Sequence, residues 1–269
     1  MQQPHKRLPP AFGWVGGKTK LSKDIVQLMP AHSLYIEVFG GALSVLYAKP
    51  KFKLPRYREV VNDINGELIN LHRMIQTRPE SLSQTLSRLL ISREIFYKLK
   101  QGVYKPRSDI ERAAYYYYLL TQSFGAKGEN FAMSAKTRRP KDIYKGFDVW
   151  SQRLRFVTIE NMPFEQLITT YNRDEALFYC DPPYVGTEHY YKNMPSFGIE
   201  EHIKLRDTLA SSQGKFLLSY NDCDVVRDLY RDFNIIQSKD VVYTLHAASY
   251  KSVKEVYITN YDQEKVKSG

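Results

Sequence analysis

A regular alternation of strand-like and helix-like segments constrains the fold of this chain more than any other feature of its sequence. Runs of strand-forming residues at 33–37 and 59–62 each lead into a turn rich in glycine, asparagine or aspartate. The segment after the second run places Leu68, Leu71 and Ile75 at helical spacing. Because parallel strands need crossover helices, a strand–turn–helix repeat of about 25 residues predicts βαβ units.

The middle of the chain interrupts this alternation. Residues 79–144 have the pattern of a mostly helical region, and a helix predicted over 111–121 contains the run Tyr115–Tyr118. We expect this helix to bury one or two of the four rings rather than to display a base-stacking row. Strand-like runs return at 155–160, 177–180, 216–219, 234–236 and 253–259, and further helices are predicted at 21–28, 43–48, 163–171, 198–211 and 225–231. The sequence therefore predicts an α/β core with a mostly helical insertion between its second and third strands.

Charge and cysteine content narrow the class of partner and the compartment. Lysine and arginine number 39 against 29 acidic residues, which gives a net charge of +10 and suits a polyanion, although a generically basic protein has the same charge. Cys180 and Cys223 lack ligand-like spacing, which argues against a disulfide scaffold or a zinc site. Residues 1–10 lack the apolar run of a signal peptide, and no run reaches membrane-spanning length. We expect a cytoplasmic protein that does not associate with membranes.

The sharpest chemical signal is the turn Asp181-Pro182-Pro183-Tyr184, which directly follows the strand predicted at 177–180. Ligands of open α/β sheets bind outside the carboxyl ends of the strands. The two prolines remove two N–H donors, which leaves carbonyl oxygens and a carboxylate as acceptors. Tyr184 adds a flat ring on which a planar base can stack. We interpret the turn as a receptor for an amino group, and an ordinary proline turn with a surface aspartate is the competing interpretation.

Two further turns place polar groups at strand ends. Glu37 ends the first strand and precedes Phe39, Gly40 and Gly41, and these glycines let the backbone approach a ligand closely. Asp63 ends the second strand, where a carboxylate can accept hydrogen bonds from ribose hydroxyls. Capping of the next helix by Asp63 would look identical in sequence, and the two roles are compatible.

The glycine-rich turn Trp14-Val15-Gly16-Gly17-Lys18 combines an aromatic ring with a cation. Lys18 can hold a carboxylate, and Trp14 can cover a purine or a cation. A phosphate-binding P-loop is excluded, because its spacing would need a glycine at Phe12 and a preceding strand. Together with the acidic strand ends, this turn indicates a nucleoside that carries a carboxylate, bound beside a receptor for an amino group.

These motifs, in this order, resemble those of the Dam-type DNA adenine-N6 methyltransferases. The family pattern of W-x-G-G-K, E-P-F-x-G-G, D-[IL]-N, an insertion and D-P-P-Y is matched by Trp14–Lys18, Glu37–Gly41, Asn62–Asn65 and Asp181–Tyr184. The resemblance covers nearly the whole chain, through 214–220 and 253–257. Two departures are Val38 in place of the family's proline and Ala42-Leu43 after the glycines. Neither removes a charged or catalytic group, so we expect an active enzyme.

The resemblance implies an enzyme that uses S-adenosylmethionine, without a metal, to methylate N6 of a flipped adenine in double-stranded DNA. It implies a Rossmann-like methyltransferase sheet with helices on both faces and a smaller, mostly helical inserted domain. The catalytic domain is expected at 1–75 and 150–269, and the target-recognition insertion at 76–149. The implied catalytic residues are Asp181, Pro182, Pro183 and Tyr184. The implied cofactor-binding residues are Trp14, Gly17, Lys18, Glu37, Phe39, Gly40, Gly41, Asp63, Ile64 and Asp181.

The insertion is expected to contact DNA through basic side chains, namely Lys127, Lys136, Arg138, Arg139 and Lys141. Such residues serve as phosphate contacts or guanine readers, and a solvated basic loop is the competing interpretation. If the loop is solvated, DNA reading would fall to Lys127 or to 189–192. The resemblance also suggests GATC as the recognition sequence and a monomer or weak dimer, and it leaves a partner restriction nuclease open.

Several other functions share parts of this pattern. N4-cytosine methyltransferases use a similar acceptor site but typically carry S-P-P-Y, and protein glutamine methyltransferases carry N-P-P-Y. A DNA-binding regulator on a decayed methyltransferase fold would have broken motifs, whereas Lys18, Asp181 and Tyr184 are intact. A restriction endonuclease would need a metal-binding cluster of acids, which the sequence does not reveal.

Overall fold

A computed structural model describes residues 7–51, 56–132, 142–186, 197–238, 241–242 and 252–263. The chain divides into two compact units. The helical unit comprises Met1–Thr19, Gly41–Lys51 and Asn65–Ile159, and the sheet unit comprises Lys20–Gly40, Phe52–Ile64 and Glu160–Gly269. The chain thus passes between the units within two of the predicted ligand-binding turns, at Gly40–Gly41 and at Ile64–Asn65.

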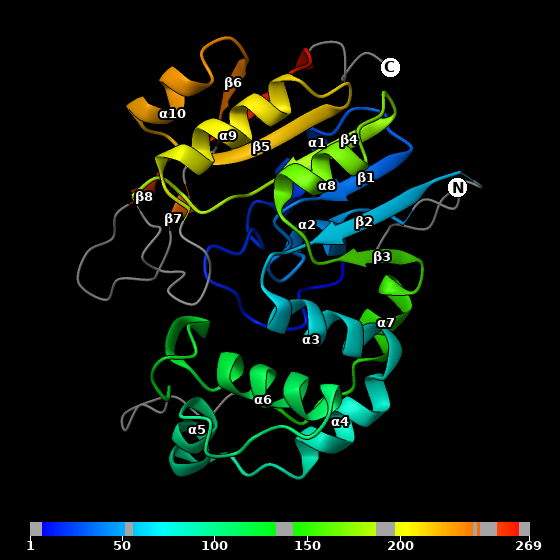
Figure 1. The fold of residues 1–269 in the computed structure, drawn as a ribbon, viewed down its shortest axis with the longest axis vertical. Helices are drawn as coiled ribbons and strands as arrows, with labels where there is room; N and C mark the ends of the chain where they lie inside the picture. The colour runs from blue at the N-terminus through cyan, green and yellow to red at the C-terminus, as the bar shows by residue number, and fades with distance from the viewer. Residues whose placement is uncertain are drawn as a thin grey trace. The chain divides into compact units, whose positions relative to one another are not determined.

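A seven-stranded sheet runs in the order β3-β2-β1-β4-β5-β9-β6 (Figure 1). Its strands are β1 (Leu34–Glu37), β2 (Arg58–Asn62), β3 (Val157–Glu160), β4 (Ala176–Cys180), β5 (Lys215–Asn221), β6 (Asn234–Gln237) and β9 (Glu255–Thr259), and β7 (Val241–Val242) and β8 (Ser252–Val253) form a separate pair. Strands β2, β1, β4 and β5 are parallel neighbours, whereas β9 pairs antiparallel with both β5 and β6. The carboxyl ends of four adjacent strands therefore meet at one edge of the sheet.

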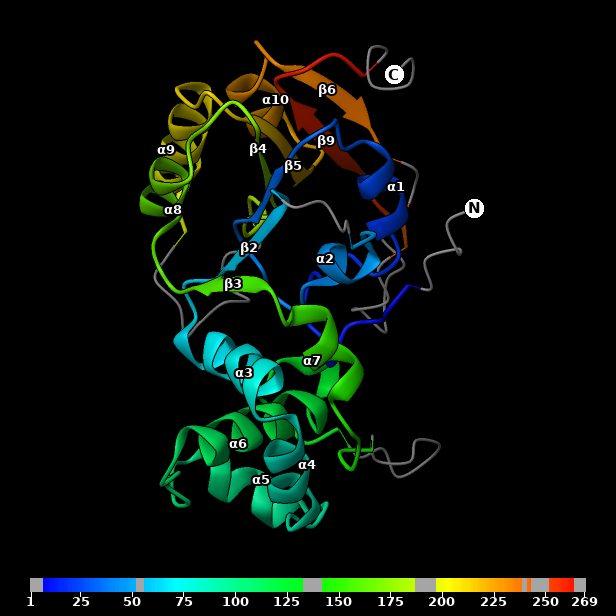
Figure 2. The same ribbon diagram turned by 90° about the vertical axis from the view of Figure 1, so that its right-hand side faces the viewer.

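Alternation along the strands separates the two faces of the sheet. Ile36 of β1, Phe178 of β4 and Leu218 of β5 belong to an apolar core with Leu167 of α8 (Phe164–Thr170) and Leu205 of α9 (Ile199–Ala210). α10 (Asp224–Leu229) packs into the same core, while α1 (Ser22–Gln27) lies on the opposite side of the sheet from α8 and α9 (Figure 2). The central strands are buried on both faces, as is typical of a parallel sheet covered by helices.

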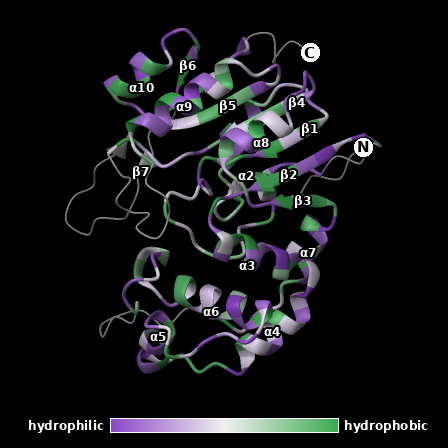
Figure 3. Ribbon diagram, viewed as in Figure 1, coloured by the Kyte–Doolittle hydropathy of each residue, from purple (hydrophilic) through white to green (hydrophobic). Residues whose placement is uncertain are grey.

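The helical unit contains α2 (Ser44–Ala48), α3 (Gly66–Thr77), α4 (Pro79–Ser87), α5 (Arg93–Lys100), α6 (Asp109–Thr121), a short 3-10 turn (Phe124–Ala126) and α7 (Asp148–Leu154). Three of these helices begin at a polar cap, because the side chains of Asn65, Ser92 and Ser108 accept hydrogen bonds from the first turns of α3, α5 and α6. α3 and α4 carry both hydrophobic and hydrophilic stretches (Figure 3), as expected for helices with one buried face. In α6, Tyr117 and Tyr118 are buried and their two tyrosine neighbours are partly exposed, which confirms that one or two rings serve packing.

The α/β class, the Rossmann-like sheet with helices on both faces and the mostly helical insertion are confirmed. One local prediction was wrong. The run at 253–259 is not one strand, since Lys254 separates β8 from β9 and the two belong to different sheets. The alternative role of Asp63 as the cap of α3 is filled by Asn65, because it is the Asn65 side chain that accepts from the amides of Glu67 and Leu68. The predicted division into 1–75 with 150–269 and 76–149 concerns function and stays a prediction.

In the part of the chain that the structure describes, no helix has both the length and the apolar character needed to cross a membrane.

Candidate active site at the carboxyl edge of the sheet

The sheet unit brings three of the predicted turns to one edge. Parallel register aligns Glu37 at the end of β1 with Val61 of β2 on one side and with Tyr179 of β4 on the other. The residues that follow these strand ends, including Asp63 and Asp181, therefore leave the sheet at neighbouring positions. This edge is where ligands bind in open α/β sheets.

The Asp181–Tyr184 turn continues directly from β4, which is buried along its whole length. Tyr184 packs against the apolar core of the sheet unit, and its ring centroid lies 6.0 Å from that of Tyr220 on β5. The side-chain amide of Asn221, at the end of β5, donates to the Val185 carbonyl oxygen at 3.2 Å. Contacts from β5 thus hold both the ring of Tyr184 and the backbone that follows it.

Two buried tyrosines lie close to the acidic groups of this edge. Tyr35 donates a 2.9 Å hydrogen bond to the Glu37 carboxylate, and burial together with the Glu37 charge raises the pKa of Tyr35 well above its usual value. Burial, assisted by the Asp181 charge, likewise raises the pKa of Tyr179. Both phenols are therefore neutral at physiological pH.

A network centred on Asn62 fixes the end of β2. The Asn62 side chain donates to the carbonyl oxygens of Val38 and Met162 at 3.0 and 3.1 Å and accepts from the Met162 amide at 2.9 Å. The Gly40 amide donates to the Asn62 carbonyl oxygen at 2.7 Å, and the Asn161 side chain donates to that of Asp63, also at 2.7 Å. These bonds hold the turns that carry Glu37 and Asp63 together, while Ile64 beside them is 40% exposed.

The helical unit holds the glycine-rich turn and Gly41. Lys18 is buried, and its ammonium donates to the Gly16 carbonyl oxygen at 3.0 Å, while the Gly17 amide donates to the Trp14 carbonyl oxygen. Gly41 has φ +49°, and a Cβ there would lie 2.8 Å from two atoms of the Trp14 indole. Only glycine therefore fits both the backbone and the ring at this position. Leu43 also has a positive φ of 57°, which costs about 1–2 kcal/mol and must be held by its buried surroundings.

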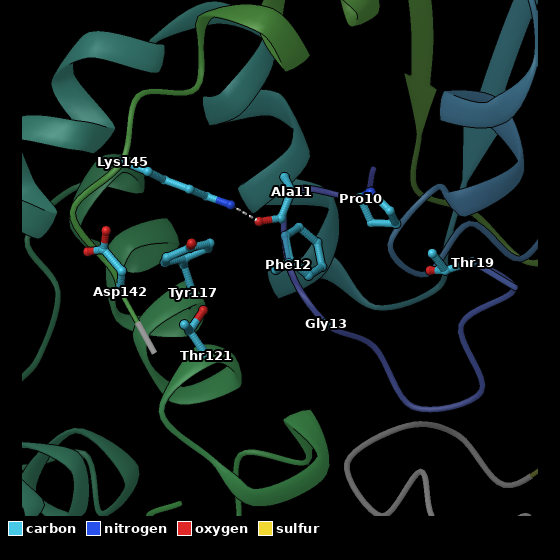
Figure 4. A pocket seen from close by; sticks show the side chains of 9 residues that line it. All are labelled: Pro10, Ala11, Phe12, Gly13, Thr19, Tyr117, Thr121, Asp142 and Lys145. Atoms are coloured by element: carbon cyan, nitrogen blue, oxygen red, sulfur yellow. Dashed lines mark hydrogen bonds between the residues drawn. The ribbon is translucent and has the colours of Figure 1, made fainter. Parts of the chain in front are cut away.

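The segment before Trp14 lies against α6 and the residues before α7. It lines a cavity of about 270 Å³, bordered by residues that include Pro10, Phe12, Tyr117 and Lys145 (Figure 4). The Lys145 ammonium donates to the Ala11 carbonyl oxygen, and burial lowers the pKa of Lys145 to about 8. Pairing with this lysine thus anchors the chain that leads into the glycine-rich turn.

His72 of α3 is the residue that reaches Gly41. It is 1% exposed, and its Nε2 lies 2.8 Å from the Gly41 carbonyl oxygen. Burial lowers the pKa of His72 to about 4, against a smaller opposing effect of the bond to Gly41. The imidazole is therefore neutral, and because a carbonyl oxygen can only accept, Nε2 carries the proton.

This pKa predicts a pH dependence of stability. Because the pKa is lowered in the folded state, the contribution of His72 is complete above the unfolded pKa of about 6.5 and is lost as the pH falls towards 4. Between pH 7 and pH 5 we expect wild type to lose about 2 kcal/mol relative to His72→Gln, measured by urea unfolding at each pH. Parallel stability curves for the two proteins would contradict this expectation.

The sequence did not indicate the structural contacts of three residues, namely Asn62, His72 and Asn221. Asn62 was visible as a polar residue within a buried strand, but His72 and Asn221 had no sequence signal, because their partners are distant in the chain. Lys127 is half-buried in the loop after α6. The other predicted DNA contacts, Lys136, Arg138, Arg139 and Lys141, lie outside the described residues, and so does the segment 189–192. No group of metal-ligating side chains is found among the residues that the structure describes.

Comparison with known proteins identifies the family that shares this arrangement. The family model described as D12 class N6 adenine-specific DNA methyltransferase matches residues 14–244. This match begins at Trp14 and extends beyond the Asp181–Tyr184 turn.

Curated relatives align over most of their own length. The type II methyltransferase M1.LlaDCHI of Lactococcus lactis subsp. cremoris is 29% identical, over 97% of this chain and 98% of the relative. The type II methyltransferase M.CviBI of Paramecium bursaria Chlorella virus NC1A is 26% identical, over 83% and 86%. The retron Ec67 DNA adenine methylase of Escherichia coli is 27% identical, over 82% and 80%.

Proposed function

Since the chain belongs to the D12 class N6 adenine-specific DNA methyltransferases, we propose that it methylates N6 of an adenine flipped out of double-stranded DNA, with S-adenosylmethionine as the donor. Membership of the family makes the chain a DNA adenine methyltransferase. The proposal adds the identity of the methyl donor and the flipping of the target base. The observation that carries them is the Asp181–Tyr184 turn at the carboxyl edge of the sheet, beside the strand ends of Glu37 and Asp63.

The donor set fits S-adenosylmethionine. Asp63 and Glu37 are acceptors for hydroxyl and amino groups, and Lys18 is a cation for the carboxylate. Gly41 leaves room for the Trp14 ring that a Cβ at this position would take. Gly17, Phe39, Gly40, Ile64 and Asp181 complete the proposed cofactor-binding set. The cofactor supplies a methyl group on a sulfonium, which is activated enough to need no metal and no enzyme nucleophile.

Asp181–Tyr184 receives the target base. The Asp181 carboxylate and the Pro182 carbonyl oxygen accept hydrogen bonds from the two N6 hydrogens, and Pro183 keeps the turn free of a competing amide donor. Tyr184 stacks on the adenine ring. The two hydrogen bonds favour a lone pair localised on N6 and aim it at the methyl group, so positioning supplies most of the rate.

The methylated product tests this function. DNA treated with the pure protein and S-adenosylmethionine is digested to nucleosides and analysed by mass spectrometry. We expect N6-methyldeoxyadenosine and no N4-methyldeoxycytidine, and long-read sequencing of the same DNA gives the recognition sequence. Methylcytosine as the sole product would overturn the base assignment, and absence of any methylated base together with intact DNA binding would favour a regulator.

Replacing Asp63 or Lys18 tests the cofactor assignment. Asp63→Ala and Lys18→Ala should each weaken S-adenosylmethionine binding by about 1–3 kcal/mol, since each removes a hydrogen bond to a charged group. Isothermal titration calorimetry measures the change, and Asp63→Asn, which keeps the shape of the side chain, separates charge from packing. Unchanged affinity in both alanine variants would remove these residues from the cofactor site.

DNA recognition is assigned to the insertion at 76–149, with the catalytic domain at 1–75 and 150–269. Lys127, Lys136, Arg138, Arg139 and Lys141 are proposed to contact the duplex. The net charge of +10 supports a polyanionic partner.

Arg138 and Arg139 allow phosphate contacts to be distinguished from base reading. A phosphate contact predicts that the double alanine variant binds all DNA more weakly, with a salt slope lower by about one per contact. A guanine contact predicts a loss of about 1–3 kcal/mol on the cognate site alone. We expect at least one phosphate contact. Binding is measured on cognate and scrambled duplexes at several salt concentrations.

A double alanine variant of Lys105 and Arg107 serves as the control, because it removes the same charge from exposed positions of the insertion. If the Arg138/Arg139 variant matched wild type in affinity, slope and site preference, the basic loop would be a solvated surface.

A further inference from the structure

The His72 side chain of α3 contacts two segments of the helical unit that belong to or lead into the proposed cofactor site. These are the loop at Gly41 and the segment that precedes Trp14. His72 Nε2 donates to the Gly41 carbonyl oxygen at 2.8 Å, and the His72 ring lies 5.4 Å from the ring of Phe12, two residues before Trp14. Phe12 in turn meets the edge of the Tyr117 ring of α6. The imidazole is therefore enclosed between the glycine loop and the segment that leads into the glycine-rich turn.

The left-handed backbone at Gly41 gives the hydrogen bond from His72 a structural role. Gly41 is in the left-handed region and packs directly against the Trp14 indole, and Leu43 is also left-handed. A backbone of this kind persists only where its surroundings hold it. His72 supplies a hydrogen bond from α3 to this loop.

We propose that His72 is a positioning residue for the cofactor, holding Gly41 and Trp14 in the arrangement that receives S-adenosylmethionine. This inference rests on the proposed function, in that Trp14 and Gly41 are taken to line the cofactor site. His72 itself touches no reacting atom. Its role is to fix the carbonyl oxygen of Gly41 and the ring of Phe12.

Helix α3 also connects this loop to the insertion. Asn65 Nδ2 donates to the Tyr116 hydroxyl at 3.0 Å, and Asn70 Nδ2 donates to the Asp109 carbonyl oxygen at 2.9 Å. Both bonds join α3 to α6. Of these side chains of α3, only His72 bonds to the Gly41 loop, whereas the partners of Asn65 and Asn70 lie in α6.

Three variants separate positioning from general stability. His72→Leu nearly keeps the volume of the side chain but removes the hydrogen-bond donor, whereas His72→Gln keeps a donor at the end of a flexible side chain. Asn70→Leu is the control: it removes a side-chain-to-carbonyl bond from the same helix, but the partner of that bond lies in α6 and not in the Gly41 loop. Dissociation constants for S-adenosylhomocysteine and S-adenosylmethionine are measured by calorimetry, with KM and kcat for methylation.

We expect His72→Leu to weaken binding of both cofactor forms about tenfold and to raise the KM for S-adenosylmethionine similarly, with kcat at saturation within twofold of wild type. His72→Gln should recover at least half of the lost binding free energy. Asn70→Leu should lower the unfolding midpoint but leave the dissociation constants unchanged.

A folded His72→Leu protein with wild-type affinity would overturn the inference, and so would an equal loss of affinity in Asn70→Leu. If the leucine variant does not fold, His72→Asn replaces it, because the shorter amide leaves Gly41 without its donor, and equal affinities of the Asn and Gln variants would then contradict the role. Wild-type protein that binds neither cofactor form would instead refute the proposed function itself.

Discussion

Asp181→Asn should lower the methylation rate at saturating cofactor by about 10²–10³-fold while the protein remains folded and still binds DNA. The substitution keeps the shape of the side chain, but it replaces a charged acceptor with an amide. The amide can turn its own donor towards the amino group of the base.

Asp222→Asn is the matched control for this experiment. Asp222 follows β5 at the same edge of the sheet, and its carboxylate is paired with Arg227 at 2.6 Å. Removing this charge should leave the single-turnover rate within about threefold of wild type, since exposed pairs contribute little. If Asp181→Asn kept more than about a tenth of the wild-type rate, less than about 1.4 kcal/mol of barrier would belong to Asp181, and its proposed role would be wrong.

Gly41→Ala should destabilise the folded protein by about 2–5 kcal/mol and weaken cofactor binding with it. The new Cβ adds the cost of a left-handed residue, about 1–2 kcal/mol, to a clash at 2.8 Å with the Trp14 indole, a further 1–3 kcal/mol. Relief of the clash requires Trp14 to move, and Trp14 is proposed to cover the cofactor. Urea unfolding measures the first effect and calorimetric titration with S-adenosylhomocysteine the second.

Gly102→Ala separates the two contributions. Gly102 has φ +69°, but a Cβ there meets nothing within 4 Å. This variant should therefore lose only the backbone part, about 1–2 kcal/mol, and keep full cofactor affinity. Equal losses of folding free energy in the two variants would show that Trp14 can move aside at no cost in stability. The close fit between Gly41 and Trp14 would then have no role in cofactor binding.

Much of the fold could be predicted because its signals are local. The strands β1, β2, β4 and β5 were predicted to within one or two residues, since a buried parallel strand is a short apolar run ended by a turn. The helices of the sheet unit could also be predicted, because their signals are local as well. The order of the strands could not be predicted, because a run of apolar residues does not specify its neighbour. In particular, nothing in the run at 253–259 indicated that β9 would lie between β5 and β6.

The sequence by itself determined which chemical groups stand at the strand ends. The prolines after Asp181 and the glycines after Glu37 act through the conformation of their own backbone, so their consequences do not depend on distant contacts. Tertiary structure alone decided which groups support them. His72 reaches Gly41 across 31 positions and Asn221 reaches Val185 across 36, because hydrogen bonds between buried groups depend on which elements pack together. The cap of α3 was likewise decided by the structure, in which the helix begins after Asn65 and the Asn65 side chain accepts from its first turn.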